Sequence, residues 1–278
     1  MIISISFEQV APIILHLELI QIDSVHGYII TECYNITMEG KFIQRIVREA
    51  EELLSRDFAV YAKGSEGDLV TDIDYLVERF LIKKIQAEYP DFAIISEEFN
   101  ADTELSDNCF IIDPIDGTKN FANGLPLWGI QVACRKNGET IASVIDMPAL
   151  KEFYFADGSG AYLNGEKISV REVPVLNAFY AVIGGDVIEA ATKMQKYGST
   201  HRVFGSACVP FGFLAAGRMH GVSFRAENPW DFEPGLFLAK QAGAVVKSEP
   251  GFHAAAMNEV FLGILKKESG QPTSQITD

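Results

Sequence analysis

Two carboxylates that could bind a cation, Asp113 and Asp116, stand three residues apart at the end of a short apolar run. The run, 109–112, has the length and composition of a buried strand, so both acids are expected where that strand ends. The proline between them stiffens the turn, and Gly117 lets the backbone come close to a ligand. A helix that begins near Thr118 would point free N–H groups into the same space, where they suit a phosphate. Hard oxygen ligands beside an anion site favour a divalent cation that bridges to a phosphoryl group.

Each part of this string also has a purely local explanation, because Asp-Pro and Asp-Gly are common turn dipeptides. A turn, however, requires neither the threonine nor the apolar strand. The whole string, residues 109–121, resembles the signature of the inositol monophosphatase family, the magnesium-dependent, lithium-sensitive phosphatases. The resemblance covers about Met38 to Leu265. It implies an α/β (α+β) fold, a layered α-β-α-β-α sandwich of the inositol monophosphatase or sugar phosphatase type.

The composition excludes several classes of protein. The chain has 278 residues, of which 48% are hydrophobic, enough for a large core in one domain or in two closely joined lobes. A net charge of −15 argues against nucleic-acid binding. The apolar N-terminal stretch carries Glu8, His16 and Glu18, which argues against a signal peptide or a membrane span. The four cysteines lack metal or redox spacing, so we expect reduced thiols and a cytoplasmic protein.

Four segments are expected along the chain. Residues 1–37 precede the resemblance and are interpreted as an N-terminal appendage. Residues 38–177 should form an α+β lobe with most of the acids, and residues 178–267 a second lobe that carries Asp231. Residues 268–278 are polar and are predicted to be a disordered tail.

Hydrophobic periodicity predicts the elements that must position the acids. The predicted helices cover residues 39–58, 71–89, 187–197, 205–217 and 233–242. The predicted strands cover residues 92–95, 109–112, 128–134, 140–147, 152–156, 178–183, 219–225 and 260–265. Hairpin turns are expected at Asn137-Gly138 and Asn164-Gly165, which makes the sheet of the first lobe mostly antiparallel.

The resemblance gives roles to acids ahead of the central string. In the family, a Val-Thr-x-x-Asp segment supplies an acid for a further, weaker metal, and Asp74 stands at that place. Thr71 and Asp74 also form a helix-capping pair, which is a sufficient structural reason for this acid. Lys63 and Asp68 fall where the family has a mobile loop that closes over the metals.

A second family segment, Gly-Glu-Glu, corresponds here to Ser96, Glu97 and Glu98. The resemblance makes Glu97 a metal ligand that helps to activate water, although Ser96 departs from the glycine. Adjacent glutamates are usually surface residues. Here, however, the pair directly follows a predicted buried strand, and a second predicted strand that ends in acids comes soon after it. This position makes a functional role more probable than it is for an ordinary surface pair.

The second signature of the family is a Trp-Asp pair that opens a helix, and Trp230-Asp231 resembles it. Asp231 would then be both helix cap and metal ligand. Small residues usually follow the pair, whereas this chain has 232–235, Phe-Glu-Pro-Gly. The family often has a sugar-binding glutamate where this chain has Phe224, and Glu227 is the nearest acid. These departures weaken any claim for inositol itself.

The resemblance implies two or three Mg²⁺ ions per site. One ion would be held by Glu97, Asp113 and the Ile115 carbonyl, a second by Asp113, Asp116 and Asp231, and a labile third by Glu97 and Asp74. Glu97 and Thr118, with Asp74 beside them, would be the catalytic residues that orient the attacking water. The expected substrate contacts are Asp116, Gly117, Thr118, Ser206 of the Gly-Ser-Ala triplet, Glu227 and Asp231.

The sequence thus predicts a magnesium-dependent phosphomonoesterase that acts on a small sugar or inositol phosphate, of the inositol-1-phosphate type, without a covalent phosphoenzyme. Bisphosphate nucleotidase, fructose-1,6-bisphosphatase and histidinol-phosphatase activities on the same metal core remain alternatives. A non-catalytic phospho-ligand or RNA-polymerase-type interaction protein is an alternative from another class. The family implies a homodimer.

Overall fold

In the computed structural model, the strand expected to carry the first two acids is β6 (Cys109–Asp116), and all of its residues are buried. The structure describes residues 21–22, 29–30, 36–55, 57–63, 69–185, 187–225 and 228–269. The chain divides into two units, Met1–Asn35 and Ile36–Asp278. In the first unit, β1 (Gln21–Ile22) pairs antiparallel with β2 (Ile29–Ile30). Most of the expected appendage and tail therefore lies outside the described residues.

The second unit contains both helices and strands. The helices are α2 (Met38–Glu51), α3 (Asp72–Glu88), α4 (Thr118–Ala122), α5 (Val187–Met194), α6 (Cys208–Ala215), α7 (Pro229–Gln241) and α8 (Glu259–Ser269). The other strands are β3 (Val60–Ala62), β4 (Leu69–Thr71), β5 (Ala93–Ser96), β7 (Gly129–Lys136), β8 (Glu139–Met147), β9 (Glu152–Asp157), β10 (Gly160–Leu163), β11 (Glu166–Ile168), β12 (Phe179–Ile183), β13 (Thr200–Arg202), β14 (Gly221–Phe224), β15 (Val245–Glu249) and β16 (Phe252–Ala256). Short 3-10 turns cover Pro148–Leu150, Val175–Asn177 and Gln195–Tyr197.

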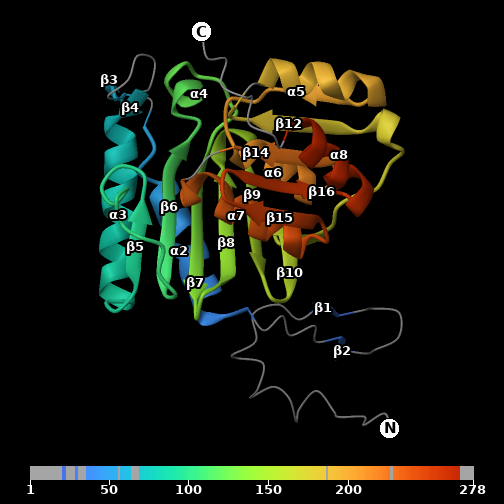
Figure 1. Cartoon of the computed structure of the whole chain (residues 1–278). Helices are drawn as coiled ribbons and strands as arrows, with labels where there is room; N and C mark the ends of the chain where they lie inside the picture. The colour runs from blue at the N-terminus through green and yellow to red at the C-terminus, as the bar shows by residue number, and fades with distance from the viewer. Residues whose placement is uncertain are drawn as a thin grey trace. The chain divides into compact units, whose positions relative to one another are not determined.

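Two large sheets organise this unit (Figure 1). The first has the order β11-β10-β9-β8-β7-β6-β5, and only its β5–β6 pair is parallel among the described strands. The second has the order β13-β12-β14-β16-β15 and mixes parallel with antiparallel pairs. The expectation of a mostly antiparallel sheet in the first lobe is confirmed.

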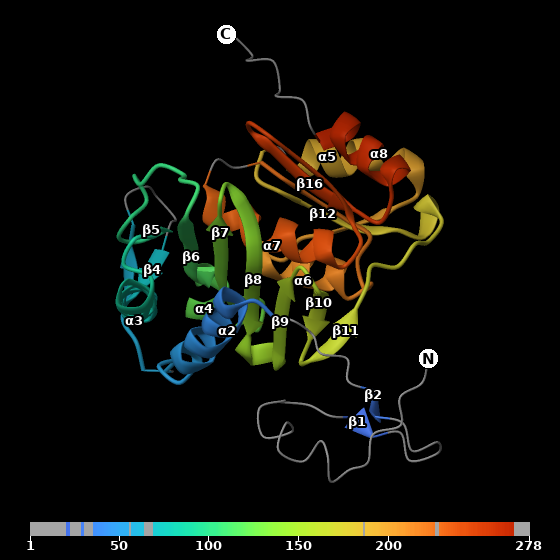
Figure 2. The same cartoon turned by 90° about the horizontal axis from the view of Figure 1, so that it is seen from below.

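Helices and sheets form five layers (Figure 2). Helices α2 and α3 cover one face of the seven-stranded sheet, and α6 and α7 lie between its other face and the five-stranded sheet. Helices α5 and α8 cover the outer face of the five-stranded sheet. Both faces of each sheet are apolar, so a hydrophobic core forms between each pair of adjacent layers. The predicted α-β-α-β-α sandwich is confirmed.

Some predicted elements are wrong. Residues 260–265, expected as a strand, lie in α8, where Phe261, Leu262 and Leu265 share one buried helical face. The hairpin β15–β16 was not predicted. The helix expected over 39–58 ends at Glu51. Among the described residues, no helix is long and apolar enough to cross a membrane.

Candidate active site

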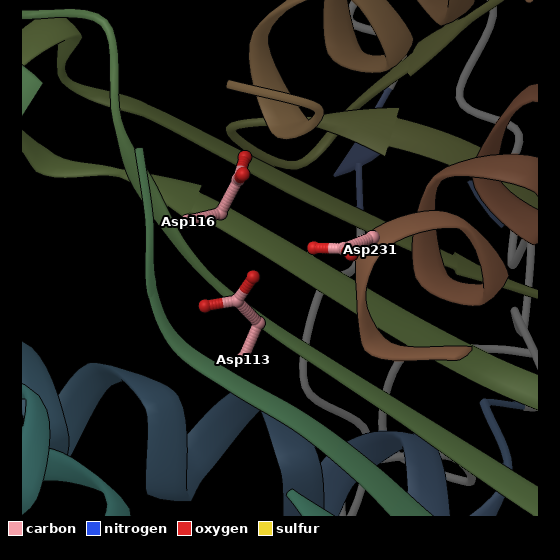
Figure 3. A group of neighbouring side chains, drawn as sticks. All are labelled: Asp113, Asp116 and Asp231. Carbon is pink, nitrogen blue, oxygen red and sulfur yellow. The ribbon is translucent and has the colours of Figure 1, made fainter. Parts of the chain in front are cut away.

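Three acids from two distant segments of the chain meet in one place. Asp113 and Asp116 lie on β6, and Asp231 lies in the first turn of α7. One carboxylate oxygen from each lies within 4.8 Å of the others. Figure 3 shows Asp231 extending from its helix toward the two strand carboxylates. The predicted convergence of these three acids is therefore present.

An irregularity in β6 makes this convergence possible. Asp113 pairs with Gln131 of β7 and Asp116 pairs with Gly129, so three steps on β6 oppose two on β7. In a regular strand, residues three apart would point to opposite faces of the sheet. The extra residue forms a bulge that turns both carboxylates to the same face. Pro114 suits this position because it has no N–H to contribute to the ladder.

The carboxylate of Asp116 is held by the start of α6. The backbone N–H of Ala207 donates to its two oxygens at 3.0 and 2.9 Å, and the N–H of Cys208 donates at 2.5 Å. Gly117, with φ +87°, lies against the same segment, and a Cβ there would stand 2.9 Å from the Ser206 Cβ. A larger residue would therefore push the start of α6 away from Asp116. Ser206 lies beside the site, buried, and its hydroxyl has no partner among the described residues.

The signature asparagine also has a structural role, which the sequence analysis did not identify. The side-chain amide of Asn120 donates to the carbonyl oxygens of Leu127, at 2.6 Å, and Phe204, at 2.7 Å. These bonds join the short helix α4 to the segments before β7 and α6. They therefore help to fix α4, and with it Gly117 and Thr118 at its start.

Asp74 serves the helix and the site at once. One of its carboxylate oxygens accepts from the N–H and the hydroxyl of Thr71, at 2.9 and 2.5 Å, and completes the predicted capping box of α3. The other oxygen accepts from the hydroxyl of Thr118 at 3.1 Å. The same hydroxyl lies 3.0 Å from the carbonyl oxygen of Ile115. The structure therefore brings Asp74, Ile115 and Thr118 together through one hydroxyl group.

Glu97 follows β5 and faces a lysine. The ammonium of Lys63 lies 3.1 Å from Glu97 and 2.8 Å from Glu98. The Glu97 side chain keeps 25% of its surface exposed, whereas Glu98 keeps only 2%. Glu97 is thus the more accessible side chain of the pair. Two residues predicted for the site, Asp68 and Glu227, lie outside the described residues.

The expectation that Asp231 caps its helix is wrong. Helix α7 begins at Pro229 with Asn228 as its N-cap, so Asp231 lies in the first turn. A carboxylate there is still favoured by the positive end of the helix dipole.

Pro234, expected in the first turn, lies farther inside the helix. Phe224, which stands where the family often has a glutamate, is buried at the end of β14.

Burial and mutual repulsion raise the pKa values of the clustered acids. Burial, followed by repulsion from Glu97, Asp116 and Asp231, raises the pKa of Asp113 well above its usual range. Burial and the charges of Asp116 and Glu97 raise the pKa of Asp231 to about 8. Burial also raises the pKa of Glu97 to about 7, with Lys63 acting in the opposite direction. A bound cation would relieve this repulsion.

Comparison with known proteins places these residues in a family. The model of the inositol monophosphatase family matches residues 32–258. The chain is similar to the fructose-1,6-bisphosphatase/inositol-1-monophosphatase of Thermotoga maritima, at 35% identity over 76% of this chain and 84% of the relative. It is also similar to the Nus factor SuhB of Escherichia coli, at 32% identity over 75% of this chain and 84% of the relative. The solved structure of Thermotoga maritima IMPase aligns with a TM-score of 0.74 and 31% identity, covering 81% of this chain and 94% of that one.

Proposed function

The chain belongs to the inositol monophosphatase family, and we propose that it is a magnesium-dependent phosphatase that hydrolyses a small sugar or inositol phosphate, of the inositol-1-phosphate type. The observation that carries this proposal is the meeting of Asp113, Asp116 and Asp231 within 4.8 Å, beside the hydrogen-bonded Asp74 and Thr118. Acids from three elements, β6, α7 and α3, converge there, and no single helix or turn explains that convergence.

The donor set suits Mg²⁺. One oxygen of Asp113 is buried without a hydrogen-bond partner among the described residues, and a hard cation satisfies such an oxygen. In our proposal, Glu97, Asp113 and the Ile115 carbonyl hold one ion. Asp113, Asp116 and Asp231 hold a second, and Glu97 and Asp74 a labile third. When bound, Mg²⁺ neutralises charge on the phosphoryl group and favours ionisation of water.

The chain's own groups orient the reactants. Thr118, whose hydroxyl donates to Asp74, leaves its oxygen lone pairs free to accept from the attacking water. Glu97, which keeps part of its surface exposed, would help to orient that water and accept its proton. The N–H groups of Gly117 and Thr118 hold the phosphate. Asp116, Ser206, Glu227 and Asp231 complete the proposed substrate contacts.

A panel of phosphomonoesters tests the function and its alternatives together. Inositol-1-phosphate, fructose-1,6-bisphosphate, histidinol phosphate and a 3′,5′-bisphosphate nucleotide are compared by the rate of phosphate release. We expect release to require Mg²⁺, to be inhibited by Li⁺ and to have its highest kcat/KM on inositol-1-phosphate. A higher value for another ester would assign that activity instead. Trapping a phosphorylated side chain during turnover would contradict direct attack by water.

Similarity to Nus factor SuhB supports a second candidate, a protein that keeps the fold to interact with the transcription machinery. Binding of Mg²⁺ and a sugar phosphate without release of phosphate would favour this candidate. We also propose a homodimer located in the cytoplasm, and light scattering of the purified protein measures its mass in solution.

A further inference from the structure

A buried glutamate, Glu78, holds the turn that carries Glu97. Glu78 lies on α3 and its side chain is inaccessible to solvent. One carboxylate oxygen accepts from the Ser96 hydroxyl at 2.5 Å and from the backbone N–H of Phe99 at 2.8 Å. The other oxygen accepts from the backbone N–H of Glu98 at 2.9 Å. A single carboxylate thus accepts from three donors, one at the end of β5 and two in the turn that follows it.

A hydrogen bond within the turn itself also restrains it. The Asn100 amide donates to the Ser96 hydroxyl oxygen at 2.9 Å, so this hydroxyl both receives one bond and donates one to Glu78. Ser96 stands where the family commonly has glycine, and its hydroxyl adds a donor that glycine lacks. Hydrogen bonds to an ionised carboxylate are about twice as strong as neutral ones, so Glu78 restrains the turn firmly.

Helix α3 connects this turn to the other half of the site. Asp74 and Glu78 are four residues apart and lie one above the other on the same buried helix face. Asp74 accepts a hydrogen bond from the hydroxyl of Thr118. Glu78 accepts from the backbone N–H groups of Glu98 and Phe99, which directly follow Glu97. One rigid helix therefore sets the distance between Thr118, at the start of α4, and Glu97, directly after β5.

We propose that Glu78 is a positioning residue, which fixes Glu97 relative to Asp74 and Thr118 so that the Glu97-dependent cation is held in the geometry for attack on the ester. This inference rests on the proposed function. A helix-packing role alone would not need a carboxylate, because an apolar side chain of similar size would fill the same space without burying a charge. A buried acid that accepts three hydrogen bonds is instead suited to fixing the conformation of the turn.

The test compares Glu78→Gln with Glu88→Gln, which removes the same charge from an exposed position at the end of α3. Glutamine keeps the shape but presents an N–H₂ group to one of the three donors, so the turn must shift. Binding of Mn²⁺ without substrate is followed by the electron paramagnetic resonance signal of free Mn²⁺. Loss of such outer contacts typically weakens metal binding about 10- to 100-fold.

We expect Glu78→Gln to weaken one class of Mn²⁺ sites by about 10-fold or more while leaving another class unchanged. The Mg²⁺ concentration for half-maximal phosphate release should rise in parallel, with the rate largely recovered at saturating Mg²⁺. Glu88→Gln should match the wild type in both measurements. Identical Mn²⁺ curves for Glu78→Gln and wild type would overturn the proposal, even if the variant melted earlier.

Two further results keep the test decisive. If Glu78→Gln does not fold, Ser96→Ala, which removes one donor of the three, should weaken the same Mn²⁺ site by about two- to fivefold. An unchanged affinity in Ser96→Ala would then overturn the proposal. If the wild type releases no phosphate from any ester, the proposed function fails, while the Mn²⁺ curves still decide the role of Glu78.

Discussion

The hydroxyl of Thr118 lies 3.1 Å from a carboxylate oxygen of Asp74 and 3.0 Å from the carbonyl oxygen of Ile115. A hydroxyl has one proton, so it donates to only one of these acceptors at a time. Occupation of the Ile115 carbonyl by a cation would commit that proton to Asp74. The threonine oxygen would then be oriented to accept from a water molecule.

Replacing Thr118 by valine should therefore slow turnover while sparing the cation site. Valine has the same shape but no hydroxyl, and loss of such proton positioning costs about 10²- to 10⁴-fold in rate. Thr118→Ser retains the hydroxyl and should keep most of the activity. Steady-state kinetics at saturating Mg²⁺ measures the rate, and Mn²⁺ titration measures the cation site. Full activity in Thr118→Val would remove this residue from the mechanism.

Asp113→Asn should change activity and stability in opposite directions. Asp113 is buried among Glu97, Asp116 and Asp231, so removing its charge relieves repulsion in the metal-free protein. We expect a higher melting temperature than the wild type in EDTA, and a rate with Mg²⁺ lower by about three orders of magnitude or more. Calorimetry and phosphate release test the two halves of this prediction.

The control for this variant is Asp91→Asn, which removes an exposed charge between α3 and β5. It should change neither quantity. Near-normal magnesium-dependent turnover by Asp113→Asn would refute the assignment of this acid as a shared cation ligand.

Glu233, which replaces a small residue of the family pattern, should act on stability more than on activity. Its carboxylate lies 2.8 Å from the Arg135 guanidinium and also accepts from the Thr140 hydroxyl, so it joins α7 to β7 and β8. Glu233→Ala leaves a largely buried arginine without its partner and should cost about 1–3 kcal/mol of unfolding free energy. Denaturant unfolding measures this cost.

The double variant Arg135→Met/Glu233→Ala should recover part of that loss, because no charge then remains unpaired. Turnover of both variants should stay close to the wild type. A large fall in Mg²⁺ affinity in Glu233→Ala would show instead that this residue influences the cation site two positions away.

Asp146, which is not part of the proposed site, should make the free energy of unfolding depend on pH. Burial, together with the charge of Glu51, raises its pKa to about 7, and Arg48 only partly offsets this. The folded protein therefore holds this proton more tightly than the unfolded chain does. Stability should fall as pH rises from about 4 to about 7, at about 1.36 kcal/mol for each unit of pKa difference.

Asp146→Asn cannot ionise and should lose this part of the pH dependence. Its free energy of unfolding relative to the wild type should increase between about pH 4 and about pH 7 and then level off. Urea unfolding at several pH values measures the difference. A difference that does not vary with pH would mean that Asp146 is not protonated in the folded protein.

Local signals in the sequence were sufficient for many elements. The Thr71–Asp74 pair predicted the start of α3, and the Asn-Gly dipeptides predicted two hairpins, because capping and turn chemistry depend on neighbouring residues. Residues 260–265 were mistaken for a strand because a short apolar run has no decisive period. Asn258, whose side chain accepts from the N–H of Phe261, was an available sign of a helix start.

Residue types and spacing along the chain were enough to predict which residues would carry the proposed chemistry. The identities of Asp113, Asp116, Glu97 and Asp231, and the elements next to them, follow from residue types and short-range spacing, and the acids match the family signatures. Their order along the chain is local information, which the sequence contains in full.

How these residues meet depends on contacts between segments that are far apart along the chain. The bulge between Asp113 and Asp116 depends on pairing with β7, the orientation of the Asp116 carboxylate depends on the start of α6, and Glu78 reaches the turn of Glu97 only because α3 packs beside β5. Each of these contacts joins segments that are separated by many residues. Their geometry is set by packing and strand register, which local periodicity does not encode.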